Sequence, residues 1–250
     1  MLDKMQIVLK QGLYKMGLDV QRLSPGKNPS LQILKALNFF GVDLVFDIGA
    51  NVGQFASSLR AVGYRGRIIS FEPLTDAHRI LAARVARDSS WILHQRGAIG
   101  DFDGEIEINI AGNSLSSSVL PMLNAHATAA FDSAYIGKEK VPICRLDSVA
   151  SAYIPNSCRY FIKVDTQGFE WQVLDGGNKT LEQAQGVMCE LSFVPLYKGQ
   201  RLWLDLLHRL EGAGFTLWSI QPGFVDPRDG RTLQMDAIFF RTEVDVVAEN

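Results

Sequence analysis

Hydrophobic positions along the chain follow two alternating patterns. Short, nearly continuous apolar runs are typical of strands buried on both faces of a parallel sheet, and most of them lead into segments with helical apolar spacing. The runs span residues 45–48, 67–72, 91–94, 159–165 and 186–191, and two further strands are expected at 215–220 and 235–240. Strands that alternate with helices predict an α/β protein with a doubly wound, seven-stranded sheet.

Two segments fall outside this alternation. Residues 105–110 alternate strictly between polar and apolar side chains, which predicts a half-buried strand that pairs antiparallel with residues 141–146. With the Ser- and Ala-rich loop between them, these strands form a small β-hairpin insertion at about residues 104–149, and long loops of this kind usually serve function. Helical spacing at residues 2–18 and 30–40 predicts an N-terminal helical extension over residues 1–40, and we expect the helix at 2–18 to pack on the sheet edge or on a partner subunit rather than on a membrane.

Composition and charge bound the class of protein. The 250 residues, 47% of them hydrophobic, are enough for a single domain over residues 1–250 with its core at 41–250. The net charge of −2 argues against a surface for polyanions, so we expect no nucleic-acid partner. The three cysteines lack a Cys-x-x-Cys spacing, and neither a membrane-spanning run nor a signal-like apolar block is found, which predicts no stable membrane insertion and a cytoplasmic location. Assembly into a homo-oligomer stays open.

The first apolar run ends in a turn that contains glycines. The stretch Val45-Phe46-Asp47-Ile48-Gly49-Ala50-Asn51-Val52-Gly53 leads into a helical pattern, so backbone N–H groups at a helix N-terminus can approach an anionic group closely. The dinucleotide pattern Gly-x-Gly-x-x-Gly is not matched, because no third glycine follows at the required spacing. Glu72 ends the second run 19 residues after Gly53, where an acid that holds ribose hydroxyls is expected. The ligand is therefore predicted to be a nucleoside without a pyrophosphate.

These features resemble those of the class I S-adenosylmethionine-dependent methyltransferases, which have a Rossmann-like fold. The resemblance implies a mostly parallel sheet whose last strand runs antiparallel. It also implies that a glycine loop holds the methionine end of S-adenosyl-L-methionine and that the second-strand acid Glu72 holds the ribose. The loop residues concerned are Asp47, Gly49, Asn51 and Gly53.

The base of the cofactor is assigned to the residues that follow the third strand. In doubly wound sheets this strand end reaches the base of the ligand, which makes Ala98, Ile99 and Asp101 candidates for cofactor binding. Asp101 precedes Asp103-Gly104, so it can equally be a turn carboxylate. Both interpretations of Asp101 stay open.

Further motifs narrow the resemblance to the FkbM-type methyltransferase family. They are Phe71-Glu72-Pro73, Ala98-Ile99-Gly100-Asp101, Ser116-Ser117-Ser118, Arg145-Leu146-Asp147-Ser148-Val149, Ile162-Lys163-Val164-Asp165-Thr166-Gln167-Gly168-Phe169-Glu170 and Val173-Leu174-Asp175-Gly176-Gly177. The resemblance implies methylation of a hydroxyl oxygen on a sugar or natural product, as in natural product biosynthesis, with a small-molecule or glycosylated acceptor. Many relatives carry Glu where this chain has Gln167, which argues against a role that needs a negative charge there.

Acids at strand ends are the candidates for catalysis. A methyl group on a sulfonium is already activated, so transfer depends mainly on placing the acceptor oxygen, and a base that removes the hydroxyl proton adds roughly 10²- to 10⁴-fold. Asp165 and Glu190 end adjacent predicted strands, and Asp165 is also expected beside the cofactor. Asp165 can instead be a structural carboxylate that orders its turn. A magnesium ion held by Asp165, Glu190 and Asp236 is a further alternative.

The insertion loop supplies other candidates. His126 is a candidate catalytic residue that would face the acceptor, and the alternative is a solvated loop histidine. Ser116 and Ser117 are candidate substrate contacts, with a solvated turn as the alternative. Gln167, from the fourth-strand motif, completes the predicted substrate contacts.

Two other classes of function stay open. A non-catalytic nucleoside-binding module would use the same glycine loop and would bind the cofactor without turnover. A nicotinamide-dependent oxidoreductase would share the doubly wound sheet, but the missing third glycine argues against it.

Overall fold

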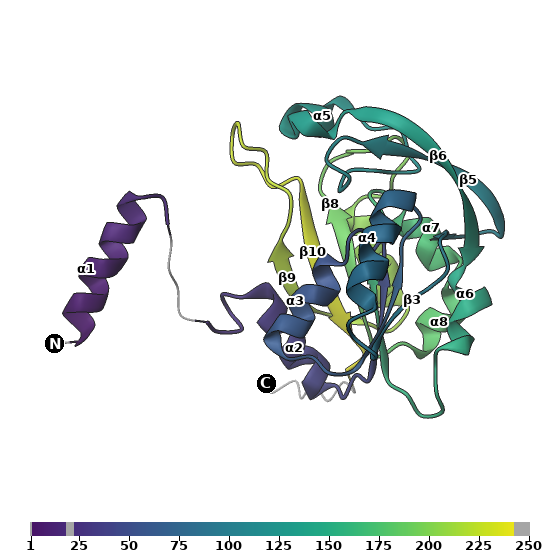
Figure 1. Cartoon of the computed structure of the whole chain (residues 1–250), viewed down its shortest axis with the longest axis horizontal. Coiled ribbons are helices and arrows are strands. Elements are labelled where there is room, and N and C mark those ends of the chain that lie inside the picture. Colours follow the sequence, from purple (N-terminus) through teal and green to yellow (C-terminus); the bar gives the residue numbers. More distant parts are fainter. Residues whose placement is uncertain (1, 19–22, 243–250) are drawn as a thin grey trace, which may run out of the picture.

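A seven-stranded sheet forms the centre of the molecule (Figure 1). This computed structural model describes residues 2–18 and 23–242. The strands are β1 (Leu44–Ile48), β2 (Arg67–Phe71), β3 (Trp91–Leu93), β7 (Tyr160–Val164), β8 (Gly186–Ser192), β9 (Thr216–Pro222) and β10 (Gln234–Phe240), in the order β3-β2-β1-β7-β8-β10-β9. The pairs from β3 to β8 are parallel, and β10 is antiparallel to both β8 and β9. The predicted Rossmann-like sheet, mostly parallel with an antiparallel last strand, is confirmed.

Helices cover both faces of this sheet (Figure 1). They are α2 (Pro29–Phe39), α3 (Gln54–Val62) and α4 (Thr75–Val85) on one face, and α6 (Leu146–Val149), α7 (Glu170–Asp175), α8 (Asn178–Gln183) and α9 (Trp203–Gly212) on the other. Successive side chains of a strand point to opposite faces, so Val45 packs with Leu59 of α3, whereas Phe46 packs in the cluster that contains Leu174 of α7. Burial of every β1 side chain fixes the register of the strand, and with it the position of the loop that follows.

A second, three-stranded sheet carries the insertion. It consists of β4 (Ala98–Gly100), β5 (Gly104–Ala111) and β6 (Tyr135–Arg145), in the order β4-β6-β5. The predicted antiparallel pairing within the insertion is confirmed, since Ile106 pairs with Val141. Ala98–Gly100 do not end the third strand as expected, because β3 stops at Leu93 and these residues pair with β6 instead. The loop between β5 and β6 contains α5 (Asn124–Ala129) and the 3₁₀ turn η1 (Phe131–Ser133), and η2 (Ala150–Ala152) follows α6.

The N-terminal helix α1 (Leu2–Lys15) lies apart from the sheet (Figure 1). The expected packing on the sheet edge is not observed, because its side chains Ile7 and Tyr14 are 55% and 72% exposed. Packing on a partner subunit stays a prediction. Residues 1, 19–22 and 243–250 of the predicted domain lie outside the described residues. Among the described helices, none combines the length and apolar character that crossing a membrane requires.

Candidate active site

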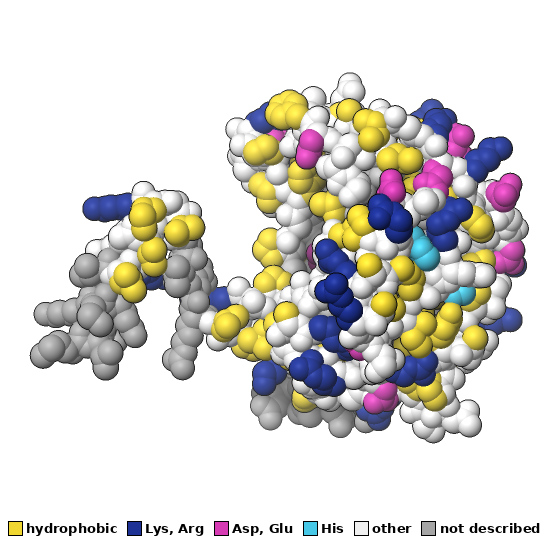
Figure 2. Space-filling model, in the orientation of Figure 1, with side chains coloured by type: hydrophobic (Ala, Val, Ile, Leu, Met, Phe, Trp, Pro, Cys, Tyr) yellow, Lys and Arg dark blue, Asp and Glu magenta, His cyan; other side chains and the backbone are white. Residues whose placement is uncertain are grey.

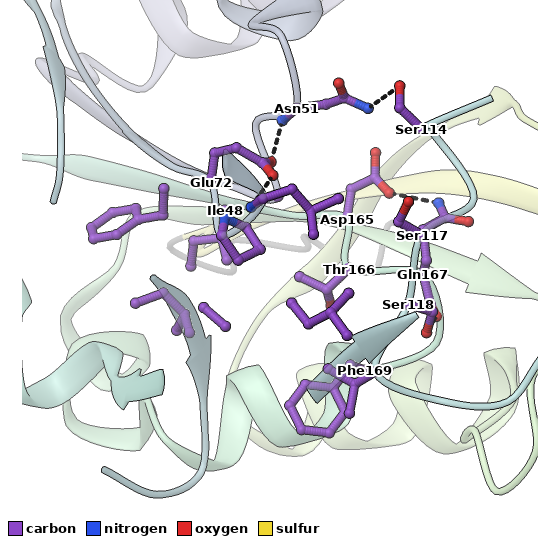
Figure 3. A pocket seen from close by; sticks show the side chains of 18 of the residues that line it. Ile48, Asn51, Glu72, Ser114, Ser117, Ser118, Asp165, Thr166, Gln167 and Phe169 are labelled. Atoms are coloured by element: carbon purple, nitrogen blue, oxygen red, sulfur yellow. Dashed lines mark hydrogen bonds between the residues drawn. The ribbon is translucent and has the colours of Figure 1, made fainter. Parts of the chain in front are cut away.

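A pocket opens at the carboxyl ends of β1, β2 and β7, beside the small sheet (Figure 3). The empty space at this pocket is about 710 Å³, including the part open to solvent. It is lined by Ile48, Gly49, Asn51, Phe71, Glu72, Pro73, Leu74, Gly97, Ala98, Ile99, Ile108, Ser114, Leu115, Ser117, Ser118, Val119, Asp165, Thr166, Gln167 and Phe169. The pocket therefore lies at the carboxyl ends of the parallel strands, which is where ligands bind in doubly wound sheets.

The glycine loop forms one wall of this pocket. Gly49 has a φ of +75°, and a Cβ at this position would collide with the carbonyl oxygen of Asp165. A side chain on Gly53 is blocked in the same way by Leu81 and Trp91, at 2.7 and 2.8 Å. The glycines therefore let the loop pass close to the end of β7 and start α3 directly behind it.

Asp47 and Lys163 lie beneath the loop. Asp47 is fully buried and accepts a hydrogen bond from the Ser70 hydroxyl, and it does not line the pocket. The Lys163 ammonium lies 3.3 Å from Asp47 Oδ1 and 3.5 Å from Asp165 Oδ2, and it donates to the Gly49 carbonyl at 3.1 Å. Burial alone would lower the pKa of Lys163, but the Asp165 and Asp47 carboxylates raise it above its usual value, so the side chain stays charged.

Lys163 was not among the predicted site residues. A lysine within an apolar run is the signal that could have found it, because a buried lysine needs paired acids. Its ammonium joins the glycine loop to the end of β7, so it holds two walls of the pocket together.

Glu72 lies at the tip of β2 and lines the pocket. Its Oε2 accepts from the Asn51 N–H and its Oε1 from the Leu74 N–H, both at 2.8 Å (Figure 3). Burial raises the pKa of Glu72 to about 7, although these two backbone donors favour the ionised form. A carboxylate can accept four hydrogen bonds, so two positions remain for ligand hydroxyls.

The part of the pocket beside the small sheet is apolar. Ala98 and Ile99 line it, together with Leu74, Ile108 and Phe169. Asp101, predicted with Ala98 and Ile99, lies on the turn after β4, where it is exposed and outside the pocket lining. The backbone carbonyl of Asp101 accepts from the Arg145 guanidinium.

Asp165 and Gln167 line the opposite part of the pocket, next to Glu190. The Gln167 amide nitrogen donates to Asp165 Oδ1 at 2.9 Å (Figure 3) and to Glu190 Oε2 at 3.0 Å. Tyr197 donates its hydroxyl to Gln167 Oε1 at 2.8 Å. Burial, and then the neighbouring Asp165 carboxylate, raise the pKa of Glu190 well above its usual value. The two strand-end acids therefore meet as predicted, with an amide between them.

Asp236 of β10 lies opposite Glu190 in the sheet register. Burial and the charge of Asp165 raise the pKa of Asp236 to about 7. Within the described residues, no group of three or more His, Cys, Asp or Glu side chains is arranged to hold a metal ion. The predicted magnesium site at Asp165, Glu190 and Asp236 is therefore without structural support.

The insertion loop covers the pocket at Ser114–Val119. The Ser118 hydroxyl donates to the Gln167 carbonyl at 2.6 Å, and the Asn51 amide donates to the Ser114 hydroxyl at 3.4 Å. Ser117 lines the pocket, and its hydroxyl accepts from the Ala111 N–H. Ser116 is buried and does not line the pocket, since its hydroxyl faces His126.

His126 lies on α5 and is neither solvated nor part of the pocket lining. It is 3% exposed, and its ring packs against Tyr197 at 5.1 Å and Phe224 at 5.2 Å. Its Nε2 is 3.0 Å from the Ser116 hydroxyl oxygen. Burial lowers the pKa of His126 to about 4, so the ring is neutral near pH 7.

The donor set of the pocket fits S-adenosylmethionine. Glu72 offers free acceptor positions for ribose hydroxyls, and the apolar part beside Ala98 suits a purine base. Asn51 Oδ1 is buried without a hydrogen-bond partner in the described part of the chain, and it can accept from the ammonium group of the methionine end. The glycine loop, held close to the end of β7, forms the wall at this end of the site.

Several solved structures are similar to this chain at low identity. Methyltransferase FkbM from Methylobacillus flagellatus KT is 16% identical with a TM-score of 0.49, and the match covers 78% of this chain and 43% of that one, so this chain spans less than half of that protein. A SAM-dependent methyltransferase from Aquifex aeolicus is 12% identical, with 88% and 100% covered and a TM-score of 0.42. Aeropyrum pernix fibrillarin, in complex with natively bound S-adenosyl-L-methionine, is 10% identical, with 83% and 74% covered and a TM-score of 0.44.

The sequence also matches a family model. No curated protein matches the chain. The model of the methyltransferase FkbM domain matches residues 47–217, which include the glycine loop, Glu72, the insertion and the end of β7. The chain therefore belongs to the FkbM family of S-adenosylmethionine-dependent methyltransferases.

Proposed function

We propose that this protein transfers a methyl group to a hydroxyl oxygen of a small-molecule or glycosylated acceptor. The observation that carries the proposal is the position of Asp165, which lines the same pocket as Glu72 and leaves its carboxylate partly exposed, at 35%. A pocket with a ribose-binding acid at one end and an accessible carboxylate at the other can hold a cofactor and an acceptor together. Sugars and natural products are the acceptor class that we propose.

Two sides of the pocket have different roles in this proposal. The cofactor side consists of Gly49, Asn51, Glu72, Ala98 and Ile99, and the acceptor side consists of Asp165, Gln167, Ser117 and Ser118. Asp47 supports the cofactor side from beneath the loop through Lys163, and Gly53 lets α3 start directly behind the loop. Glu190 supports the acceptor side through Gln167.

We assign to Asp165 the role of the base that accepts the proton of the acceptor hydroxyl. When bound, S-adenosylmethionine would supply a methyl group that its sulfonium already activates. Asp165 accepts the proton of the acceptor hydroxyl as that oxygen becomes methylated, and Lys163 at 3.5 Å supports the negative charge of the carboxylate beforehand. His126 is assigned no proton transfer, because it is buried outside the pocket lining.

A small acceptor also suits the surface. Figure 2 shows Lys and Arg side chains spread over one face of the molecule, with acidic side chains among them. A nucleic-acid backbone requires a concentrated basic surface, so this distribution supports a small acceptor instead.

The first test is calorimetric titration with S-adenosylhomocysteine beside NADH. Micromolar binding of the homocysteine compound alone is expected, because the loop lacks the glycine that a pyrophosphate needs. Binding of NADH alone would replace the proposal with an oxidoreductase. Labelled S-adenosylmethionine and a panel of sugars, polyols and glycosides then identify the acceptor, and binding without turnover on any of them would favour a non-catalytic module.

Asp165→Asn tests the acceptor side. The amide cannot take the hydroxyl proton, so turnover should fall by roughly 10²- to 10⁴-fold while binding of S-adenosylhomocysteine changes little. Asp76→Asn is the matched control, because this carboxylate is 89% exposed on α4 and outside the pocket. Equal loss of cofactor binding and turnover in Asp165→Asn would assign Asp165 to the cofactor instead.

A further inference from the structure

Gln167 makes four polar contacts, and each reaches a different part of the chain. Its amide nitrogen donates to Asp165 and to Glu190, while its amide oxygen accepts from Tyr197. Its backbone carbonyl accepts from Ser118 of the insertion loop. The two ends of the amide are thus distinguished by their partners, and the nitrogen must face the carboxylates.

The acids around this amide lie close together. Asp165 directly follows β7, whereas Glu190 and Asp236 lie within the neighbouring strands β8 and β10. Asp236 is in register with Glu190. Like charges at this distance repel one another unless a proton or a cation lies between them. Lys163 reaches Asp165 at 3.5 Å, and Gln234 donates to Glu190 Oε2 at 2.7 Å. The Gln167 NH₂ group bridges Asp165 and Glu190, since it donates to both carboxylates.

Without the amide, the carboxylate oxygens of Asp165 and Glu190 would attract a divalent cation. Carboxylate oxygens from two strand ends are the ligands that Mg²⁺ and Mn²⁺ prefer. An amide nitrogen presents protons to these oxygens, so it satisfies them without adding charge and repels a cation at the same time.

We propose that the Gln167 amide takes the place of a divalent cation between Asp165 and Glu190. It acts as a positioning residue that turns the Asp165 carboxylate toward the pocket, and it closes the acid pair to metal ions. The catalytic meaning of this arrangement rests on the proposed function, whereas the exclusion of cations does not.

The backbone conformation of Gln167 supports this positioning role. Its φ is +55°, a left-handed conformation that is uncommon for residues other than glycine. Gly168 follows with a φ of +96°, and a Cβ there would lie 2.9 Å from the Tyr197 ring. The turn at Gly168 therefore packs directly on Tyr197, the residue whose hydroxyl orients the Gln167 amide. The backbone and the amide of Gln167 are thus both held in place.

Gln167→Glu is the decisive substitution. It keeps the shape of the side chain but places a third carboxylate beside Asp165 and Glu190, which completes a set of oxygen ligands. Mn²⁺ alone is the probe, and binding is measured from the loss of its free-ion signal in electron paramagnetic resonance. The wild-type protein is expected to bind no Mn²⁺ at the acid pair up to about 1 mM, and Gln167→Glu to bind at least roughly tenfold more tightly.

Two control variants locate the effect. Asp165→Asn in the Gln167→Glu background should return Mn²⁺ binding to the wild-type level. Gln234→Glu adds the same charge beside Glu190, at a side chain that hydrogen-bonds to Glu190 and Ser192 and not to Asp165, and should gain little. The double variant keeps the test valid if the buried Gln234→Glu protein does not fold.

Three results would overturn the proposal. They are wild-type binding as tight as that of Gln167→Glu, no gain in Gln167→Glu, and an equal gain in Gln234→Glu. S-adenosylhomocysteine is titrated into the same proteins by calorimetry. A failure of this ligand to bind the wild-type protein would reject the cofactor assignment and leave the Mn²⁺ result standing, so the two failures are distinguishable.

Once an acceptor is known, Gln167→Ala tests the positioning role. It removes the amide without adding charge, so kcat should fall while the KM for S-adenosylmethionine stays within about threefold. A change in that KM alone, with kcat retained, would contradict a role in placing Asp165.

Discussion

On the cofactor side of the pocket the polar contacts to Glu72 come from backbone N–H groups, whereas on the acceptor side the contacts that surround Gln167 come mainly from side chains. Asn51 and Leu74 offer their N–H groups to Glu72. Gln167, by contrast, makes its amide hydrogen bonds with the side chains of Asp165, Glu190 and Tyr197.

Because of this difference, substitutions should affect the two sides of the pocket in different ways. The cofactor side is set by the turn after β1 and by the end of β2, so its shape follows from glycine conformation and strand register. The acceptor side is a buried polar network, in which every member relies on the others for its hydrogen bonds. Substitutions on the acceptor side should therefore spread their effects through neighbouring side chains.

Lys163→Met should have the largest effect, because this side chain joins the two sides. Removing the ammonium leaves Asp47 buried without its cation, and breaking such a pair costs about 3–5 kcal/mol in the free energy of unfolding. It also removes the donor to the Gly49 carbonyl. Urea unfolding measures the loss.

Lys138→Met is the matched control for this substitution. Lys138 also pairs with an acid, Glu107, but both side chains are exposed, at 60% and 46%. An exposed pair contributes at most about 1 kcal/mol. A loss below about 1 kcal/mol in Lys163→Met as well would mean that Asp47 is protonated in the folded protein, and that the ammonium does not bridge the two sides.

The same difference explains how far the sequence alone predicts the molecule. The strands and the glycine loop are local patterns, and the apolar run that ends in Glu72 was sufficient to predict its place in the pocket. The burial of His126 depends on Tyr197 and Phe224, which come from distant segments and have no local signature. The bridge made by Gln167 could not be predicted for the same reason, since spacing does not tell which side chains meet.

Glu72 provides a smaller test, confined to the cofactor side. Burial raises its pKa to about 7, and the ionised form is the one that accepts ribose hydroxyls. Between pH 6 and pH 8 the ionised fraction rises from roughly 0.1 to 0.9, so the affinity for S-adenosylhomocysteine should rise roughly tenfold. Calorimetry across this pH range measures the change, and Glu72→Gln should bind more weakly with a flat profile.

The stability of the protein should respond to Glu72 with the opposite sign. The folded-state pKa lies above the ordinary value of about 4.5, so the folded protein binds the extra proton between these two values. The contribution of Glu72 to stability is therefore present below about pH 4.5 and is lost as the pH rises toward 7.

For ligand binding, an affinity for S-adenosylhomocysteine that falls between pH 6 and 8, or a Glu72→Gln profile as steep as that of the wild type, would remove Glu72 from the ribose site.

Asp101→Asn should have the smallest effect, and it tests where the cofactor side ends. The sequence pattern places Asp101 with Ala98 and Ile99, but its side chain is exposed on the turn after β4 and outside the pocket lining. Affinity for S-adenosylhomocysteine should stay within about twofold of the wild type, since exposed substitutions away from a site change energies by roughly 0.5 kcal/mol or less. A tenfold loss would instead mean that the base of the cofactor extends past Ile99, and that the turn after β4 contributes the Asp101 side chain to cofactor binding.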